Sequence, residues 1–376
     1  MTRGRFAPSP TGRMHLGNVF CALLSWLSAK SKGGEWVLRI EDLDPQRSKK
    51  DYALQLMDDL QWLDLPWDGE PVWQSQRGEI YEEYLQRLTD MGLTYPCYCT
   101  RADIMATQAP HETDGRVVYK GTCRPSTPSP LTPHRSQLTV NLSPLTATTR
   151  LIVPDCTIPF TDGHYGKHDI NLAEHCGDYI IRRKDGAWAY QLAVVVDDAL
   201  MGVTEIVRGR DLLLSSPQQI HLRKLLFQRT EDRVQSTECR VQMTEYRVQM
   251  TDGLLKRKTI TDASVPTTTS FTPQTVPLRQ GDERSGGGGL TAHHSPLTVN
   301  FFHHPLLCNS EGQRLCKRDK SMDLGYLRGT GITPQEIIGK LAYLAGLTDT
   351  TTPITPSKLL PRFSWEKVPT EDIILK

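Results

Sequence analysis

The sequence predicts an α/β fold built around a parallel β-sheet. Three observations lead to this prediction. The chain opens with a strand, a turn, a helix and a second strand; strand-like runs return after residue 151; and a helical pattern follows near the end. A strand, a crossover helix and a parallel strand form the unit from which such sheets are built. With 376 residues and 38% hydrophobic content, the chain can form one or two ordinary cores.

The opening unit consists of three segments. GRFAP, residues 4–8, is predicted to be a short strand, and a turn rich in Pro and Gly follows it. Val19, Leu23 and Leu27 recur at helical spacing and predict a helix with a wide apolar face. WVLRI, residues 36–40, is predicted to be a buried strand that ends in the acidic turn EDLD.

Further elements are expected downstream. YQLAVVVDDAL, residues 190–200, and VTEIVRG, residues 203–209, are rich in β-branched residues and are predicted to be strands. SSPQQIHLRKLLF, residues 215–227, is predicted to be a helix with Ser216 at its N-cap and a proline at its first position. PQEIIGKLAYLAGL, residues 334–347, is predicted to be a helix.

Two segments differ in composition from the rest of the chain. Residues 126–149 and 229–298 are rich in Ser, Thr and Pro, and the second contains a seven-residue repeat that starts at RVQSTEC. Each repeat offers only Val and sometimes Met, which is weak evidence for a coiled coil. Such segments bury too little apolar surface to offset the entropy of ordering them, so we expect disordered insertions.

Charge and hydropathy exclude some classes of protein. A formal net charge of +1 gives no overall signature of nucleic-acid binding, so any RNA contact must come from a local basic surface. No run approaches the roughly 18 apolar residues of a membrane helix. The N-terminal MTRGRFAPSPTG lacks the apolar stretch of a signal peptide. We therefore expect a cytoplasmic protein with no membrane partner.

The turn after the first strand is a candidate nucleotide site. In RFAPSPTGRMHLGN, residues 5–18, Gly17 lets the backbone approach a ligand, and the start of the helix offers free N–H groups to phosphates. His15 and Asn18 can donate hydrogen bonds to charge that develops on a transferring α-phosphate. The alternative is a purely structural turn with Asn18 as a helix cap.

Three cysteines form a candidate metal site. Cys97, Cys99 and Cys123 provide thiolates, which Zn²⁺ prefers, and a closed structural site needs a fourth ligand. Tyr119 and His111 are both available, and on chemistry alone imidazole is the commoner ligand. The alternative is a set of reduced, unligated cysteines.

The turn at residues 5–18 resembles the HIGH signature of class I aminoacyl-tRNA synthetases. HLGN stands for HIGH, with Asn18 in place of the second histidine, and RFAPSPTG matches the glutamyl/glutaminyl branch. The resemblance implies that His15, Gly17 and Asn18 bind ATP and that His15 and Asn18 take part in catalysis.

A basic segment far downstream resembles the second signature of these enzymes, the KMSKS loop. In RLCKRDKS, residues 314–321, Lys317 matches the second lysine and is the implied catalytic and ATP-binding residue. Arg314 replaces the first lysine and keeps its charge. Cys316 replaces the usual serine, which removes a hydroxyl and adds an oxidisable thiol.

The amino-acid pocket is also implied by the resemblance. Glutamate carries two carboxylates and one ammonium, so its site needs forked cationic donors and a carboxylate. Arg5 and Arg208 suit the carboxylates, Glu41 the ammonium, and Tyr190 supplies a hydroxyl. The implied glutamate-binding residues are Arg5, Phe6, Ala7, Pro8, Ser9, Glu41, Tyr190 and Arg208.

The chain most resembles the truncated glutamyl-Q tRNA(Asp) synthetases. Their C-x-C…Y-x-x-x-C spacing favours Tyr119 as the fourth zinc ligand, and residues 322–376 are too few for an ordinary anticodon-binding domain. The resemblance implies a Rossmann-like nucleotide-binding fold with a zinc-bearing insertion and a short helical C-terminal region. The first half of the catalytic domain is expected at residues 1–95, the zinc insertion at 96–150 and the second catalytic half at 151–228. A low-complexity insertion is expected at 229–298, and a KMSKS-type and helical C-terminal region at 299–376.

The implied reaction is the ATP-dependent activation of L-glutamate, with Mg²⁺ on the nucleotide. Glutamate would then pass from the adenylate to the queuosine base in the anticodon loop of tRNA(Asp). The alternatives are a shortened glutamyl-tRNA synthetase that charges a tRNA 3′ end, or a non-catalytic RNA-binding relative. A monomer is the simplest expectation.

Overall fold

The structure of the chain is a computed structural model. It describes residues 1–106, 118–119, 121–125, 147–228, 298–315 and 323–375. Nearly all of the two low-complexity segments lies outside these residues, so their predicted disorder stays a prediction. No helix in the described ranges is long and apolar enough to cross a membrane.

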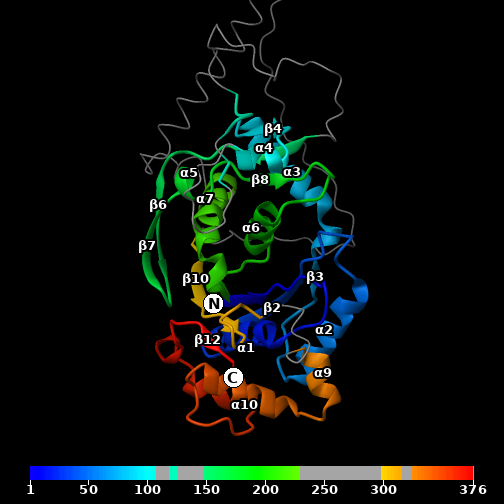
Figure 1. The fold of residues 1–376 in the computed structure, drawn as a ribbon, viewed down its shortest axis with the longest axis vertical. Coiled ribbons are helices and arrows are strands. Elements are labelled where there is room, and N and C mark those ends of the chain that lie inside the picture. Colours follow the sequence, from blue (N-terminus) through cyan, green and yellow to red (C-terminus); the bar gives the residue numbers. More distant parts are fainter. Residues whose placement is uncertain (107–117, 120, 126–146, 229–297, 316–322, 376) are drawn as a thin grey trace, which may run out of the picture.

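In the described part of the chain, the centre of the fold is a seven-stranded sheet with the order β3-β2-β1-β9-β10-β6-β7 (Figure 1). Neighbouring strands are parallel except β6 and β7, which form an antiparallel hairpin. The strands are β1 (Arg3–Phe6), β2 (Glu35–Ile40), β3 (Val72–Trp73), β6 (Thr157–Asp162), β7 (Gly166–Asn171), β9 (Glu205–Gly209) and β10 (Asn300–His304). The predicted parallel sheet is therefore present, with one antiparallel edge.

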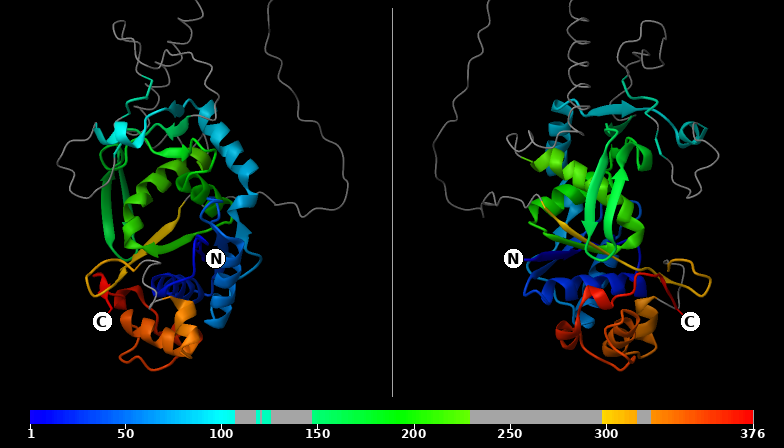
Figure 2. Two further views of the ribbon diagram at one scale, coloured as in Figure 1. Left: turned by 45° about the vertical axis from the view of Figure 1, so that its right-hand side comes forward. Right: turned by 90° about the vertical axis from the view of Figure 1, so that its left-hand side faces the viewer.

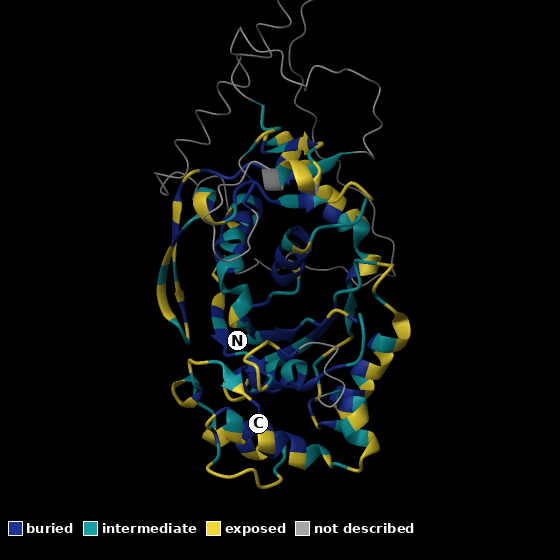
Figure 3. Cartoon of the chain, in the orientation of Figure 1, coloured by how far each residue is buried: buried dark blue, intermediate teal, exposed yellow. Residues whose placement is uncertain are grey.

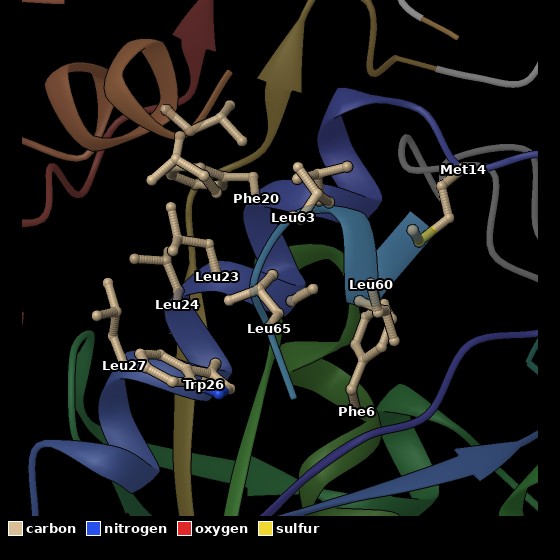
Figure 4. Close-up of a cluster of buried hydrophobic side chains, with 14 of the residues drawn as sticks. Phe6, Met14, Phe20, Leu23, Leu24, Trp26, Leu27, Leu60, Leu63 and Leu65 are labelled. Atoms are coloured by element: carbon tan, nitrogen blue, oxygen red, sulfur yellow. The ribbon is translucent and has the colours of Figure 1, made fainter. Parts of the chain in front are cut away.

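The opening strand–helix–strand unit is confirmed. Helix α1 (Leu16–Lys30) connects β1 to the parallel strand β2. Its predicted apolar face is fully buried at Val19, Leu23 and Leu27, and Figure 4 shows the two leucines packed with other apolar side chains. Full burial of one such leucine stabilises the folded chain by about 1.5–3 kcal/mol. Burial of this helix against the sheet is therefore a main source of stability.

The segment 190–200 is a helix, α6 (Tyr190–Leu200), and not the predicted strand. A short apolar run cannot be assigned to helix or strand by its periodicity alone, and burial here overrides the β-propensity of three valines. Figure 3 shows α6 as largely buried, and its side chains from Leu192 to Ala199 are inaccessible to solvent. The next strand prediction, at 203–209, is confirmed by β9.

Helix α7 (Ser216–Phe227) confirms the predicted helix but begins one residue earlier than expected. Ser215, and not Ser216, occupies the N-cap, and it makes no side-chain cap hydrogen bond. Ser216 lies inside the helix, and its hydroxyl accepts a hydrogen bond from Arg208 Nη2 at 2.8 Å. The capping motif contains no signal for this partner on strand β9.

A smaller antiparallel sheet lies at one end of the molecule and carries the cysteine segment. Its strands are β4 (Thr94–Cys97), β5 (Thr148–Leu151) and β8 (Ile180–Arg182), with helix α4 (Arg101–Ala106) after β4. Strand β5 starts inside the segment predicted as a loop at 126–149, because Thr148 pairs with Cys97. The sheet also takes β8 from the predicted second catalytic half.

The C-terminal region packs beneath α1, at the opposite end of the molecule from β4 and α4 (Figures 1 and 2). Its helices are α9 (Leu324–Gly329), α10 (Pro334–Leu344) and α11 (Pro356–Leu359), and a short pair is formed by β11 (Leu307–Cys308) and β12 (Ile373–Ile374). The other α-helices of the described residues are α2 (Lys50–Trp62), α3 (Gly78–Asp90) and α5 (Leu172–His175). The predicted helix at 334–347 is thus confirmed, and a capping box between Thr333 and Glu336 starts it.

Candidate active site and metal centre

A cavity of about 460 Å³ opens where strands β1, β9 and β10 end. Ligands of open α/β sheets bind at the carboxyl ends of the strands, where the strand order reverses, and here β1 lies between β2 and β9. Every residue predicted to bind ATP or glutamate that lies within the described ranges lines this cavity. These residues are Arg5, Phe6, Ala7, Pro8, Ser9, His15, Gly17, Asn18, Glu41, Tyr190 and Arg208. Lys317 and Cys316 lie outside the described residues.

The first turn of α1 is fixed by a reciprocal cap. His15 is the N-cap residue, and its Nδ1 accepts a hydrogen bond from the Gly17 backbone N–H at 3.1 Å. Asn18 Oδ1 accepts one from the His15 backbone N–H at 3.1 Å. A Cβ atom at Gly17 would lie 2.9 Å from the His15 ring, so a larger residue there would displace the ring from its capping position. The structural role that the sequence analysis considered for Asn18 is therefore present. The same cap holds His15, Gly17 and Asn18 at the edge of the cavity.

Two arginines and an aspartate form a buried network beside the cavity. Asp198 Oδ1 accepts hydrogen bonds from Arg39 Nη1 at 2.6 Å and from Arg5 Nε at 3.3 Å. Burial acts to raise the pKa of Asp198, but the two guanidinium groups outweigh it and hold that pKa below its ordinary value. Arg5 is therefore oriented by a carboxylate to which the sequence analysis assigns no role.

Glu41 lines the same cavity directly after β2. Its Oε1 accepts a hydrogen bond from Arg39 Nη2 at 3.0 Å, and within the described part of the chain its Oε2 accepts none. Burial raises the pKa of Glu41, although Arg39 and Arg5 oppose this effect. The side chain is held at one oxygen and presents a negative group to the cavity.

Arg208 has a different environment from Arg5. Its three nitrogens donate to His303 Nε2 at 3.0 Å, Gln219 Oε1 at 2.7 Å and Ser216 Oγ at 2.8 Å. None of these partners is a carboxylate, and no ion pair among the described residues includes Arg208. Burial lowers its pKa, and only 4% of the residue is exposed. A buried cation with neutral partners is matched by an anionic ligand.

Several cavity residues escaped the sequence analysis. His304 is buried at the end of β10, and burial lowers its pKa to about 4, so the ring is neutral. Cys21 on α1 also lines the cavity, and burial raises its pKa to about 12. No local motif contains these two residues, and only the packing of α1 against β10 brings them together. Arg314, which the sequence analysis placed at the start of the KMSKS-like segment, also lies at the cavity and pairs with Asp211.

The structure gathers the predicted metal ligands into one cluster. The sulfur atoms of Cys97, Cys99 and Cys123 all lie within 4.8 Å of one another. Tyr119 Oη lies 3.4 Å from Cys97 Sγ and 3.6 Å from Cys99 Sγ. His111 lies outside the described residues. Three thiolates and one phenolic oxygen form a donor set that fits a tetrahedral Zn²⁺ ion.

Tyr119 is held in place from two sides. The Arg150 guanidinium lies 3.8 Å from the centroid of the Tyr119 ring. The Cys123 backbone N–H donates to Tyr119 Oη at 2.6 Å. These contacts point the phenol oxygen at the three sulfurs.

Comparison with known proteins establishes the class of protein. Residues 1–259 match the family described as tRNA synthetases class I (E and Q), catalytic domain, and the chain belongs to that family. Its structure is similar to the crystal structure of glutamate-tRNA synthetase from Elizabethkingia anophelis, with a TM-score of 0.68 and 22% identity. The similarity covers 100% of this chain and 68% of that chain.

Within that class, several similar sequences carry the name glutamyl-Q tRNA(Asp) synthetase. The protein from Symbiobacterium thermophilum is 36% identical over 383 residues, which cover 99% of this chain and 95% of the relative. The protein from Neisseria gonorrhoeae is 47% identical over 226 residues, 60% of this chain and 72% of the relative. The resemblance seen in the sequence is confirmed: the chain is a glutamate-activating ligase of this type.

Proposed function

We propose that this enzyme uses ATP to convert L-glutamate to glutamyl-adenylate, with release of pyrophosphate, and then transfers the glutamyl group to the queuosine base in the anticodon loop of tRNA(Asp). The observation that supports glutamate as substrate is the charge arrangement in the cavity. Among the described residues, Arg208 is a buried cation with neutral hydrogen-bond partners, and Glu41 keeps one carboxylate oxygen without a protein donor. A ligand with carboxylates and an ammonium complements both groups.

Activation requires no protein nucleophile. A glutamate α-carboxylate oxygen attacks the α-phosphorus of ATP, the bond to the bridging oxygen breaks, and pyrophosphate leaves. Because His15 Nδ1 accepts from Gly17, a neutral ring carries its proton on Nε2, from which it can donate to a phosphate oxygen. Asn18 and the N-terminal N–H groups of α1 add further donors. Lys317 neutralises charge on the phosphates, and Mg²⁺ enters with the nucleotide.

In the second step, a hydroxyl of the queuosine ring attacks the carbonyl carbon of the adenylate, and AMP leaves. We assign the RNA-facing insertion to residues 96–150 and the catalytic halves to residues 1–95 and 151–228. Cys97, Cys99, Cys123 and Tyr119 would hold one structural Zn²⁺ ion, which supplies folding energy to the insertion. We further propose a cytoplasmic monomer.

Two assays test the function. The first is glutamate-dependent exchange of pyrophosphate into ATP without tRNA, with the Lys317→Ala variant expected to lose this exchange while staying folded. The second compares labelled glutamate transfer to tRNA(Asp) with and without queuosine. Transfer only to the queuosine-containing RNA supports the proposal. Transfer to the queuosine-free RNA, abolished by periodate oxidation of its terminal ribose, would identify 3′-end charging, and absence of exchange would identify a non-catalytic relative.

A further inference from the structure

Three buried side chains form a row across neighbouring strands next to the cavity. Asp162 ends β6, His303 lies in β10 and Arg208 lies in β9. Parallel pairing places His303 directly beside Arg208, and Phe301 of the same strand beside Asp162. Asp162 and His303 are 1% and 0% exposed. Neither of these two residues lines the cavity, so they act on a ligand only through Arg208.

The hydrogen bonds define the protonation of His303. An arginine N–H can only donate, and Arg208 Nε lies 3.0 Å from His303 Nε2, so this ring nitrogen must be an unprotonated acceptor. The ring proton is then on Nδ1, which lies 2.7 Å from Asp162 Oδ2 and donates to it. Burial lowers the pKa of His303, which favours this neutral ring.

The orientation of the Asp162 carboxylate is fixed as well. Its Oδ1 accepts from the backbone N–H groups of His164 at 3.0 Å, Tyr165 at 2.9 Å and His303 at 3.3 Å. Oδ2 is thereby left to face His303 Nδ1. The turn between β6 and β7 thus determines on which nitrogen the histidine carries its proton.

We propose that Asp162 and His303 are positioning residues that orient Arg208 toward a carboxylate of glutamate. The inference rests on the proposed function of Arg208. His303 holds Nε of the guanidinium, while Gln219 and Ser216 each hold one terminal nitrogen. These two partners use one N–H of each terminal nitrogen, and the remaining N–H groups are shared between the ligand and Tyr190, which also bonds to the Arg208 side chain from the cavity. If the proton were on Nε2, the ring N–H would face the Nε–H of Arg208. Two donors cannot form a hydrogen bond, so the guanidinium would be displaced.

The Asp162→Asn variant tests this relay with almost no change in shape. The three backbone N–H groups retain the side-chain oxygen, so the new amide group faces His303 Nδ1 and donates to it. The ring proton must then move to Nε2. Loss of a hydrogen bond to a charged group costs about 1.5–3 kcal/mol, so the KM for glutamate in pyrophosphate exchange should rise roughly 10- to 100-fold. The KM for ATP should stay within about twofold, as should both constants in the exposed control Asp169→Asn.

Nitrogen-15 NMR of the imidazole gives a readout that does not depend on activity. The wild-type His303 ring is expected to be protonated on Nδ1 and the Asp162→Asn ring on Nε2, with the signal assigned by its loss in His303→Gln. A wild-type ring protonated on Nε2 would overturn the relay. If the wild-type enzyme shows no glutamate-dependent exchange, the proposed function fails, while the NMR result still decides the protonation.

A second pair of variants applies if Asp162→Asn does not fold. In His303→Gln the side-chain oxygen can still accept from Arg208, whereas His303→Leu offers no acceptor. We expect the leucine variant to raise the KM for glutamate at least tenfold more than the glutamine variant. Equal KM values in the two folded variants would overturn the positioning role, as would an unchanged KM in a folded Asp162→Asn enzyme.

Discussion

Arg39 Nη1 donates to Asp198 Oδ1 over 2.6 Å, and this buried ion pair joins strand β2 to helix α6. Arg5 donates to the same oxygen, so one carboxylate compensates two guanidinium groups. Asp198 therefore holds together the two parts of the chain that meet at the cavity.

Removing this carboxylate should destabilise the enzyme strongly. Asp198→Ala leaves buried Arg5 without its ion-pair partner and removes one of the carboxylates that pair with Arg39, whose bond to Glu41 remains. Breaking a buried pair costs about 3–5 kcal/mol of unfolding free energy. Urea unfolding followed by circular dichroism measures the loss. The control is Glu83→Gln, which breaks the exposed pair with Arg87 on α3 and should cost no more than about 0.5 kcal/mol. Equal losses would show that Asp198 is not structurally important.

Protonation of Glu41 should weaken glutamate binding at low pH. Because burial raises its pKa, this carboxyl takes up a proton at a higher pH than an ordinary glutamate does. Protonation removes the negative charge that the ligand ammonium needs. The KM for glutamate is therefore expected to be constant above that pKa and to rise as the pH falls through it. Glu41→Gln should show a high KM for glutamate at every pH. If its KM still rose at low pH, Glu41 would not be the titrating group that binds the ammonium.

Arg208 should determine the choice between glutamate and glutamine. A neutral amide cannot match the buried guanidinium, so the wild-type enzyme should exchange pyrophosphate with glutamate and very little with glutamine. Arg208→Gln should raise the KM for glutamate by at least tenfold and reduce this preference. Arg183→Gln, which changes an exposed arginine, is the control. Equal exchange with both amino acids in the wild-type enzyme would contradict the model of the pocket.

The cysteine cluster should bind one zinc ion per chain, measurable by elemental analysis of protein purified without chelators. Cys99→Ser should lose the metal, because thiolates are the preferred donors. Tyr119→Phe should also weaken zinc binding, whereas Cys176→Ser, outside the cluster, should not. A His111→Ala variant that loses zinc while Tyr119→Phe retains it would identify histidine as the fourth ligand.

Residues 229–297 should be dispensable for activation. Lys224 on α7 and Val299 before β10 line the same small cavity, so the chain leaves and re-enters the fold at neighbouring points. A Gly/Ser linker that replaces the segment is expected to preserve glutamate-dependent exchange, since closure cost grows slowly with loop length. A soluble, folded deletion variant without exchange would show that the repeats contribute to activity.

Local patterns predicted the parts of this molecule that depend on neighbouring residues. Strand β1, helix α1 and strand β2 follow from turn residues and apolar spacing, and the motif residues around His15 do line one cavity. The strand predicted at 190–200 was wrong because its valines are buried in a helix whose carboxylates pair with distant arginines. The link from Asp162 through His303 to Arg208 depends on strand register, which no local motif contains.

The central position of β1 has a consequence during protein synthesis. Strand β1 pairs with β2 on one side and with β9, about 200 residues later in the chain, on the other. At about 5–20 residues per second, the ribosome needs roughly 10–40 s to make the missing neighbour. Throughout this interval the nascent chain carries a strand with one unpaired edge, and such edges pair readily with other chains. We therefore expect newly made copies of this enzyme to be most prone to pairing with other chains before β9 emerges.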